Sequence, residues 1–123
     1  MPFSTTYTGT TLIREWTGEV TNDELFRSLD MVKEDILNGQ IIEQALYDFT
    51  DTTTISATAK DIMRYSKQCL RMAQLNPNVR MAVIAPKDIV FGLARMWECY
   101  VDGVGYTTKV FRTREDAQSW LNS

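Results

Sequence analysis

The sequence predicts an α/β domain with a mixed five-stranded sheet and about four helices, in the order β-β-α-β-α-β-α-β-α. Short runs of β-branched and aromatic residues alternate with segments whose apolar residues recur at helical spacing. Strands that are separated by helices need crossover connections, and such connections make a sheet largely parallel. The 123 residues suit one core, so we expect a single domain over residues 1–123.

A β-hairpin is predicted at the N-terminus. Phe3–Tyr7 and Thr11–Thr17 are rich in Thr, Ile, Tyr and Trp, and Thr8–Thr10 separates them. We therefore expect a three-residue loop, with the second strand ending at Gly18. The hairpin supplies an antiparallel neighbour, which makes the predicted sheet mixed.

Two helix starts follow from capping patterns. Thr21–Glu24 has the Thr-x-x-Glu spacing of a capping box, and Asn38-Gly39 is a typical helix end. Thr58–Asp61 resembles a second cap, which opens a helix that runs to about Leu75, before the break at 76–78. The first helix carries an apolar face of Leu25, Leu29, Val32 and Ile36.

The remaining strands are predicted from their apolar runs. Ile41–Phe49 is expected to form a strand, followed by a loop over 51–54. Val79–Ala85 is short and almost uniformly apolar, as expected of a central strand that is covered on both faces. Tyr106–Phe111 is predicted as the last strand.

Two further helices complete the predicted order. A third helix spans Ile89–Val101, after the turn that begins at Pro86. Thr113–Asp116 caps a short C-terminal helix that carries Trp120 and Leu121.

Composition excludes several classes of partner. The net charge is −3 and the basic residues are scattered, so the sequence lacks the basic stripe that nucleic-acid binding needs. No apolar run approaches the length of a membrane span, and no signal-peptide pattern occurs at the N-terminus. Cys69 and Cys99 form no C-x-x-C motif. We expect a cytoplasmic protein with reduced thiols.

Histidine is absent from the chain. Its absence excludes Ser-His-Asp and Cys-His catalysis and most transition-metal sites. No Gly-rich phosphate loop occurs either. We therefore expect no enzyme, no catalytic or metal-binding residue and no cofactor.

The Thr- and Ser-rich segment 50–58 is the first candidate binding site. It lies where a strand feeds a helix N-terminus, and hydroxyls and free N–H groups in such a place can hold a phosphate. The alternative is that these residues form turns and helix caps, which is their more common use. Asp48 and Asp51 offer a carboxylate pair for a cation or for acid–base chemistry, and capping of a turn is again the alternative.

The helix predicted over Ile89–Val101 is the second candidate. Its apolar arc is wider than one sheet face needs to cover. Contact with a partner chain, with a second copy of the chain or with an apolar small molecule would cover the remainder; packing against a neighbouring helix of the same domain is the alternative. The residues of this possible interaction surface are Phe91, Met96, Trp97 and Tyr100.

Several segments together resemble a known family. They are Trp16-Thr17-Gly18, Leu46-Tyr47-Asp48, Met81–Ala85, Phe91–Met96, and Val110-Phe111-Arg112 with Glu115-Asp116-Ala117 and Trp120-Leu121. In these segments, which span nearly the whole chain, the sequence resembles the SpoIIAA-like fold of STAS domains, the anti-sigma-factor antagonists. It is most similar to the bacterial STAS/SEC14-like branch, whose function is unknown. The resemblance implies a SpoIIAA-like domain that works by protein–protein interaction.

The phosphoswitch of that family is incomplete here. In phosphoswitch members a serine of an Asp-Ser-Ser-Gly motif is phosphorylated, and the matching positions are Ser56-Ala57-Thr58-Ala59. Ser56 replaces the aspartate, and only Thr58 offers a hydroxyl at the phosphorylated position. We expect a non-enzymatic interaction or regulatory module in which Thr58 is a helix cap. A carrier or sensor of a lipid-like or other apolar small molecule is the first alternative, and an enzyme of unknown type is the second.

Overall fold

The computed structural model describes residues 2–123, and its elements follow the predicted order. The strands are β1 (Phe3–Thr8), β2 (Thr11–Thr21), β3 (Gln44–Ser56), β4 (Val79–Ile84) and β5 (Tyr106–Phe111). The helices are α1 (Asn22–Leu37), α2 (Ala59–Leu75), α3 (Asp88–Val101) and α4 (Arg114–Leu121).

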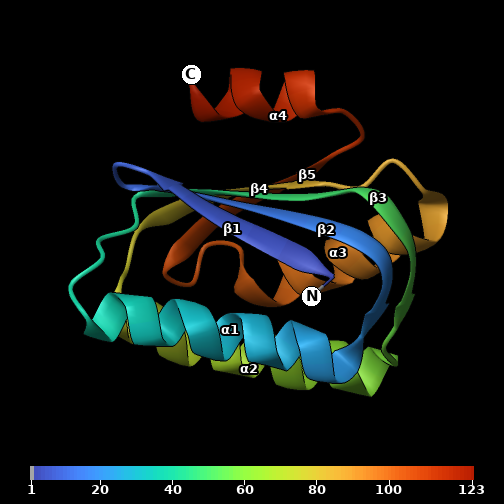
Figure 1. Cartoon of the computed structure of the whole chain (residues 1–123), viewed down its shortest axis with the longest axis horizontal. Coiled ribbons are helices and arrows are strands. Elements are labelled where there is room, and N and C mark those ends of the chain that lie inside the picture. The colour runs from blue at the N-terminus through green and yellow to red at the C-terminus, as the bar shows by residue number, and fades with distance from the viewer. Residues whose placement is uncertain (1) are drawn as a thin grey trace.

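The five strands form one mixed sheet in the spatial order β1-β2-β3-β4-β5. β1 is antiparallel to β2, and every other neighbouring pair is parallel. Figure 1 shows α1, α2 and α3 on one face of the sheet and α4 alone on the other. β4 lies inside the sheet with both faces covered, as its apolar sequence predicted, while β3 occupies the middle position.

The sheet separates the apolar core into two parts, one on each face. The larger part lies between the sheet and the three helices of one face. The smaller part lies under α4 and consists of Leu46, Ala82, Ile84, Ala117 and Leu121. β3 and β4 therefore bury both of their faces, which explains their continuous apolar runs.

The hairpin is tighter and its second strand longer than predicted. Thr8 pairs with Thr11, so the loop has two residues, Gly9 and Thr10, where three were expected. β2 continues through Gly18, which has φ +69°, and the ladder shifts its register at this point. The glycine makes the bulge possible, because its left-handed conformation is unfavourable for other residues.

The prediction of a loop over 51–54 is wrong, because these residues extend β3. Asp51 pairs with Thr17, and Ser56 at the end of β3 pairs with Thr21 at the end of β2. Threonine is β-branched and favours a strand where a neighbour offers a ladder, and here Thr52 is fully buried. The paired ends of β2 and β3 curve toward the starts of α1 and α2 (Figure 1).

Arg14 is buried in the larger core, with only 2% of its surface exposed. Its guanidinium donates to the Thr5 hydroxyl from Nε and Nη2, at 3.2 and 2.9 Å, and to the Ser28 carbonyl from Nη1, at 2.9 Å. It also lies 4.9 Å from the centre of the Phe3 ring. Within residues 2–123 no carboxylate is ion-paired with Arg14. Hydrogen bonds and the aromatic ring thus stabilise this charge.

We expect Arg14→Ala to lower the free energy of unfolding by about 3 kcal/mol, because it leaves a cavity and removes the donors from two acceptors. Urea denaturation measures the change. Arg27→Ala on the exposed face of α1 is the matched control and should stay within about 0.5 kcal/mol of the native chain. If Arg14→Ala lowers the free energy of unfolding no more than the control does, Arg14 has no structural role.

Candidate functional site

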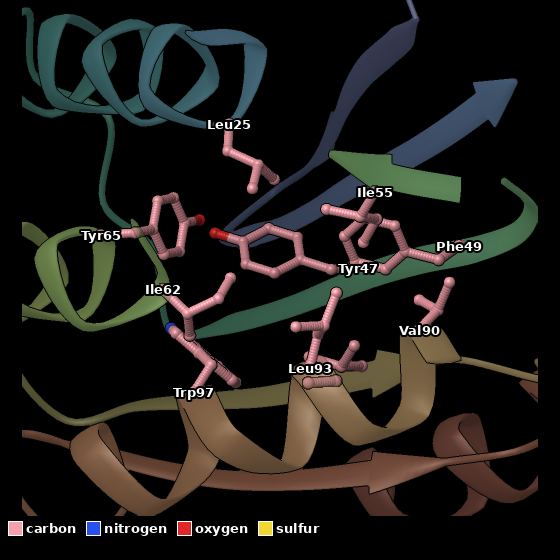
Figure 2. A pocket seen from close by; sticks show the side chains of 11 residues that line it. Leu25, Tyr47, Phe49, Ile55, Ile62, Tyr65, Val90, Leu93 and Trp97 are labelled. Atoms are coloured by element: carbon pink, nitrogen blue, oxygen red, sulfur yellow. The ribbon is translucent and has the colours of Figure 1, made fainter. Parts of the chain in front are cut away.

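An apolar pocket of about 50 Å³ lies between β3, α2 and α3. Four of its lining residues, Ile55, Tyr65, Leu93 and Ala94, are only half-buried, so the pocket opens to the surface between α2 and α3. Figure 2 shows side chains converging on it from both helices and from the sheet. The lining consists of Leu25, Tyr47, Phe49, Ile55, Ile62, Tyr65, Val83, Val90, Leu93, Ala94 and Trp97.

Two phenol groups supply polar atoms to this apolar pocket. The hydroxyls of Tyr47 and Tyr65 point toward one another in Figure 2. Burial raises the pKa of Tyr47 to about 12, although the Arg14 guanidinium acts in the opposite direction. Burial also raises the pKa of Tyr65 well above its ordinary value. Both phenols are therefore neutral at physiological pH and act as hydrogen-bonding groups, not as bases.

Trp97 lines the pocket, and Cys69 is buried in the same core without being part of the lining. Burial raises the pKa of the Cys69 thiol to about 12, so the thiol is protonated and unreactive. The indole N–H of Trp97 is buried and has no hydrogen-bond partner within residues 2–123. The arrangement suits binding of an apolar group and offers no nucleophile for catalysis.

The predicted phosphate position lies at the N-terminus of α2, next to this opening. Thr58 and Asp61 form a capping box: the Thr58 hydroxyl accepts from the Asp61 N–H at 3.1 Å, and the Asp61 carboxylate accepts from the Thr58 N–H at 2.9 Å. The Ser56 hydroxyl faces the Glu19 carboxylate at 3.4 Å. The Thr58 hydroxyl is thus engaged as a helix cap, and the Asp61 carboxylate already supplies a negative charge at the N-terminus of α2, which favours the capping role of Thr58.

The four residues predicted as an interaction surface do not share one face of α3. Trp97 is buried in the pocket. Phe91 packs under Arg112, whose guanidinium carbon lies 3.8 Å from the ring centre. Met96 and Tyr100 lie on the outer edge of the helix, together with Ile89, which is 74% exposed. The apolar edge that faces solvent is therefore Ile89 and Tyr100, beside half-buried Leu93 and Met96.

The carboxylate pair considered from the sequence is not brought together for cation binding. Asp48 accepts from the Thr50 N–H at 2.8 Å and pairs with Arg114 at 3.2 Å, whereas Asp51 is exposed. Across residues 2–123, no cluster of three His, Cys, Asp or Glu side chains is placed to hold a metal ion. None of the helices in that range is long and apolar enough to cross a bilayer.

Sequence reasoning missed the two tyrosines that line the pocket. Tyr47 lies between Ala45 and Phe49 in strand alternation, and all three face the larger core. Tyr65 lies three residues after Ile62 on α2, both on the side of the helix that lines the pocket. Strand alternation and helical spacing predict that both tyrosine side chains point inward. Neither pattern predicts that their hydroxyls point toward one another.

We expect Thr58→Ala to lower the free energy of unfolding by about 1 kcal/mol, because the first turn of α2 loses its cap. Thr58→Ser keeps the hydroxyl and should have a smaller effect. Thermal and urea denaturation measure both. A phosphate found on Thr58 in the cells that make the protein, together with changed partner binding, would contradict a purely capping role.

The raised pKa of Tyr47 predicts a loss of stability at alkaline pH. The neutral phenol is favoured in the folded chain, so its contribution is complete below pH 10 and is lost as the pH rises toward 12. The expected loss from this group is about 2 kcal/mol by pH 12. Urea denaturation across this range measures it. Tyr47→Phe should reduce the alkaline loss by that amount, and an unchanged pH profile would contradict the assignment.

Comparison by sequence finds no relative: no protein-family model and no curated protein matches the chain. Comparison by structure does find proteins of similar fold. An uncharacterized protein of the DUF3478 family from Shewanella loihica PV-4, with a SpoIIAA-like fold, has a TM-score of 0.60 and 20% identity, over 97% of this chain and 91% of that one.

Two anti-sigma-factor antagonists are similar as well. A putative antagonist from Thermotoga maritima has a TM-score of 0.64 and 12% identity, over 98% of this chain and 95% of that one. Unphosphorylated SpoIIAA has a TM-score of 0.57 and 14% identity, over 98% of both chains. At these identities the likeness establishes the fold and not the activity. The resemblance inferred from the sequence is thus confirmed as a shared architecture: the chain has the SpoIIAA-like fold.

Proposed function

We propose that this chain is a non-enzymatic, regulatory protein-interaction module, and that its partner docks over the opening between α2 and α3. The observation that carries the proposal is the apolar pocket beside an exposed apolar helix edge. Ile89 is 74% exposed and Tyr100 is 42% exposed, and half-buried Leu93 joins this edge to the pocket. A partner that covers the edge can insert one apolar side chain into the pocket.

The size of the pocket supports a side chain over a lipid. Ligand pockets for small molecules typically measure about 300–1,000 Å³, whereas this one measures about 50 Å³. It accommodates a few heavy atoms without movement of α3. The regulatory character rests on the shared fold with anti-sigma-factor antagonists. Both cysteines are free thiols, which suits the reducing cytoplasm in which we place the module.

A carrier of an apolar small molecule is the second candidate. The nearly continuous apolar lining, with two phenols at its inner end, favours it. The pocket would have to enlarge for a lipid-like ligand. Native mass spectrometry separates the two ideas, because a carrier retains its ligand and a docking module does not.

The test of the module begins with a photo-crosslinking residue in place of Tyr100, introduced in the cells that make the protein. The same residue in place of Gln118, exposed on α4 on the other face of the sheet, is the matched control. We expect a partner that crosslinks from the α3 position and not from α4. The identified partner is then purified for binding measurements.

We expect Ile89→Glu and Ala94→Leu each to weaken the affinity of that partner at least about tenfold, the first by a buried charge and the second by filling the pocket mouth. Gln118→Glu adds the same charge to α4 and should leave the affinity unchanged. Isothermal titration calorimetry measures the three constants, and circular dichroism confirms that each variant folds. Equal affinities for all variants would overturn the proposed docking site.

A further inference from the structure

The outer edge of β1 carries unpaired backbone groups. The Thr17 N–H donates to the Pro2 carbonyl at 2.7 Å. This bond shows which residues of β1 point their backbone groups toward β2: Pro2 and every second residue after it. In an antiparallel pair alternate residues face the neighbouring strand, so the N–H and C=O groups of Phe3, Thr5 and Tyr7 point away from β2. Within residues 2–123 no backbone hydrogen bond from another segment reaches them. Figure 1 shows β1 at the near edge of the sheet with no segment in front of it.

On the opposite edge of the sheet, the chain itself covers the start of β5. On β5 the Thr108 N–H donates to the Asp102 carboxylate at 2.8 Å. The Tyr106 carbonyl accepts from the Gly103 N–H at 2.8 Å. Lys109 adds an exposed charge to the strand. Natural proteins use such contacts and charges to prevent strand addition at an edge.

β1 has none of these protections. Its six residues, Phe3–Thr8, include no charged residue and no proline, and all but the serine are types that favour strands. The side chains that face the helical layer are already held: Thr5 binds Arg14, and the Tyr7 hydroxyl donates to Asp35 at 2.7 Å. The edge is therefore ordered in advance, which lowers the entropic cost of pairing.

We propose that two copies of this chain associate through β1, antiparallel about a two-fold axis at Thr5. The outward groups of Phe3, Thr5 and Tyr7 are symmetric about Thr5, so Thr5 pairs with the partner's Thr5. Phe3 pairs with the partner's Tyr7, and both side chains lie on the helical side of the sheet. Each such pair exchanges both N–H···O bonds. The two five-stranded sheets become one continuous sheet.

A second copy suits this edge better than an unrelated strand does. Two-fold antiparallel pairing presents the same segment to itself, so every outward donor meets an acceptor. The absence of charge on β1 means that no like charges meet across the axis. α3 packs on β5 and α2, toward the other edge of the sheet, so the dimer leaves the proposed docking site free.

The experiment adds charge on the exposed side of β1. Ser4 and Thr6 are exposed, and in the proposed register Ser4 faces the partner's Thr6. By sedimentation equilibrium we expect a dimer for the native chain. Ser4→Lys with Thr6→Lys should raise its dissociation constant at least ~100-fold, through like-charge repulsion. Thr107→Lys, at an exposed position of β5, is the matched control and should leave the dissociation constant unchanged.

A charge-reversed pair separates repulsion from misfolding. The variant with Ser4→Glu and Thr6→Glu should be monomeric alone and should form a one-to-one heterodimer with the double-lysine variant. In the native dimer the amides of Thr5 and Tyr7 should exchange slowly with deuterium, and they should exchange fast in either double variant. A native chain that stays monomeric at its highest soluble concentration, a dimer indifferent to the lysines, or fast exchange at Thr5 would each overturn the proposal. None of these outcomes bears on partner binding at α3.

Discussion

The parallel ladder between β2 and β3 is the interaction on which the rest of the structure depends. The two strands stay paired from Thr11 and Gln44 to Thr21 and Ser56, well beyond the point at which β4 ends. Near the middle of the two strands, the rings of Trp16 and Phe49 stack with 5.5 Å between centres. This ladder closes one end of the larger core and brings the first turns of α1 and α2 to neighbouring positions, because Thr21 pairs with Ser56.

The same geometry determines what the start of α2 can bind. Each of the two neighbouring helices begins with a threonine capping box. The threonine hydroxyl accepts from the N–H of the third helical residue, and the acidic side chain of that residue accepts from the threonine N–H. Glu19 and Ser56 lie between these helix starts. A helix N-terminus normally attracts anions, but here that attraction is used within the chain. The proposed docking site lies instead at the apolar opening between α2 and α3, where no charged residue contributes to the lining.

The strand and helix order was predictable because each element has its own apolar periodicity. The extension of β3 was not, since 51–54 contains turn-forming Asp51 and no apolar residue, and only pairing with β2 makes it a strand. The burial of Arg14 had a signal, because Leu12, Arg14 and Trp16 share one face of β2 and all three are buried. The wide apolar arc of α3 indicated that part of the helix would stay exposed, but of the four residues named for that surface only Tyr100 is exposed. The pocket did not follow, since it depends on how three elements far apart in sequence converge.

The hydrogen bond from the Thr108 N–H to Asp102 makes the two edges of the sheet unequal. A sheet that accepts strands at both edges grows into a filament without a defined length, whereas a sheet that accepts a strand at one edge stops growing after a single addition. The Asp102 carboxylate and the Gly103 N–H cover the start of β5, and β1 has no such cover. When two copies pair through β1, as proposed, the unequal edges favour a particle of two chains over an open-ended polymer.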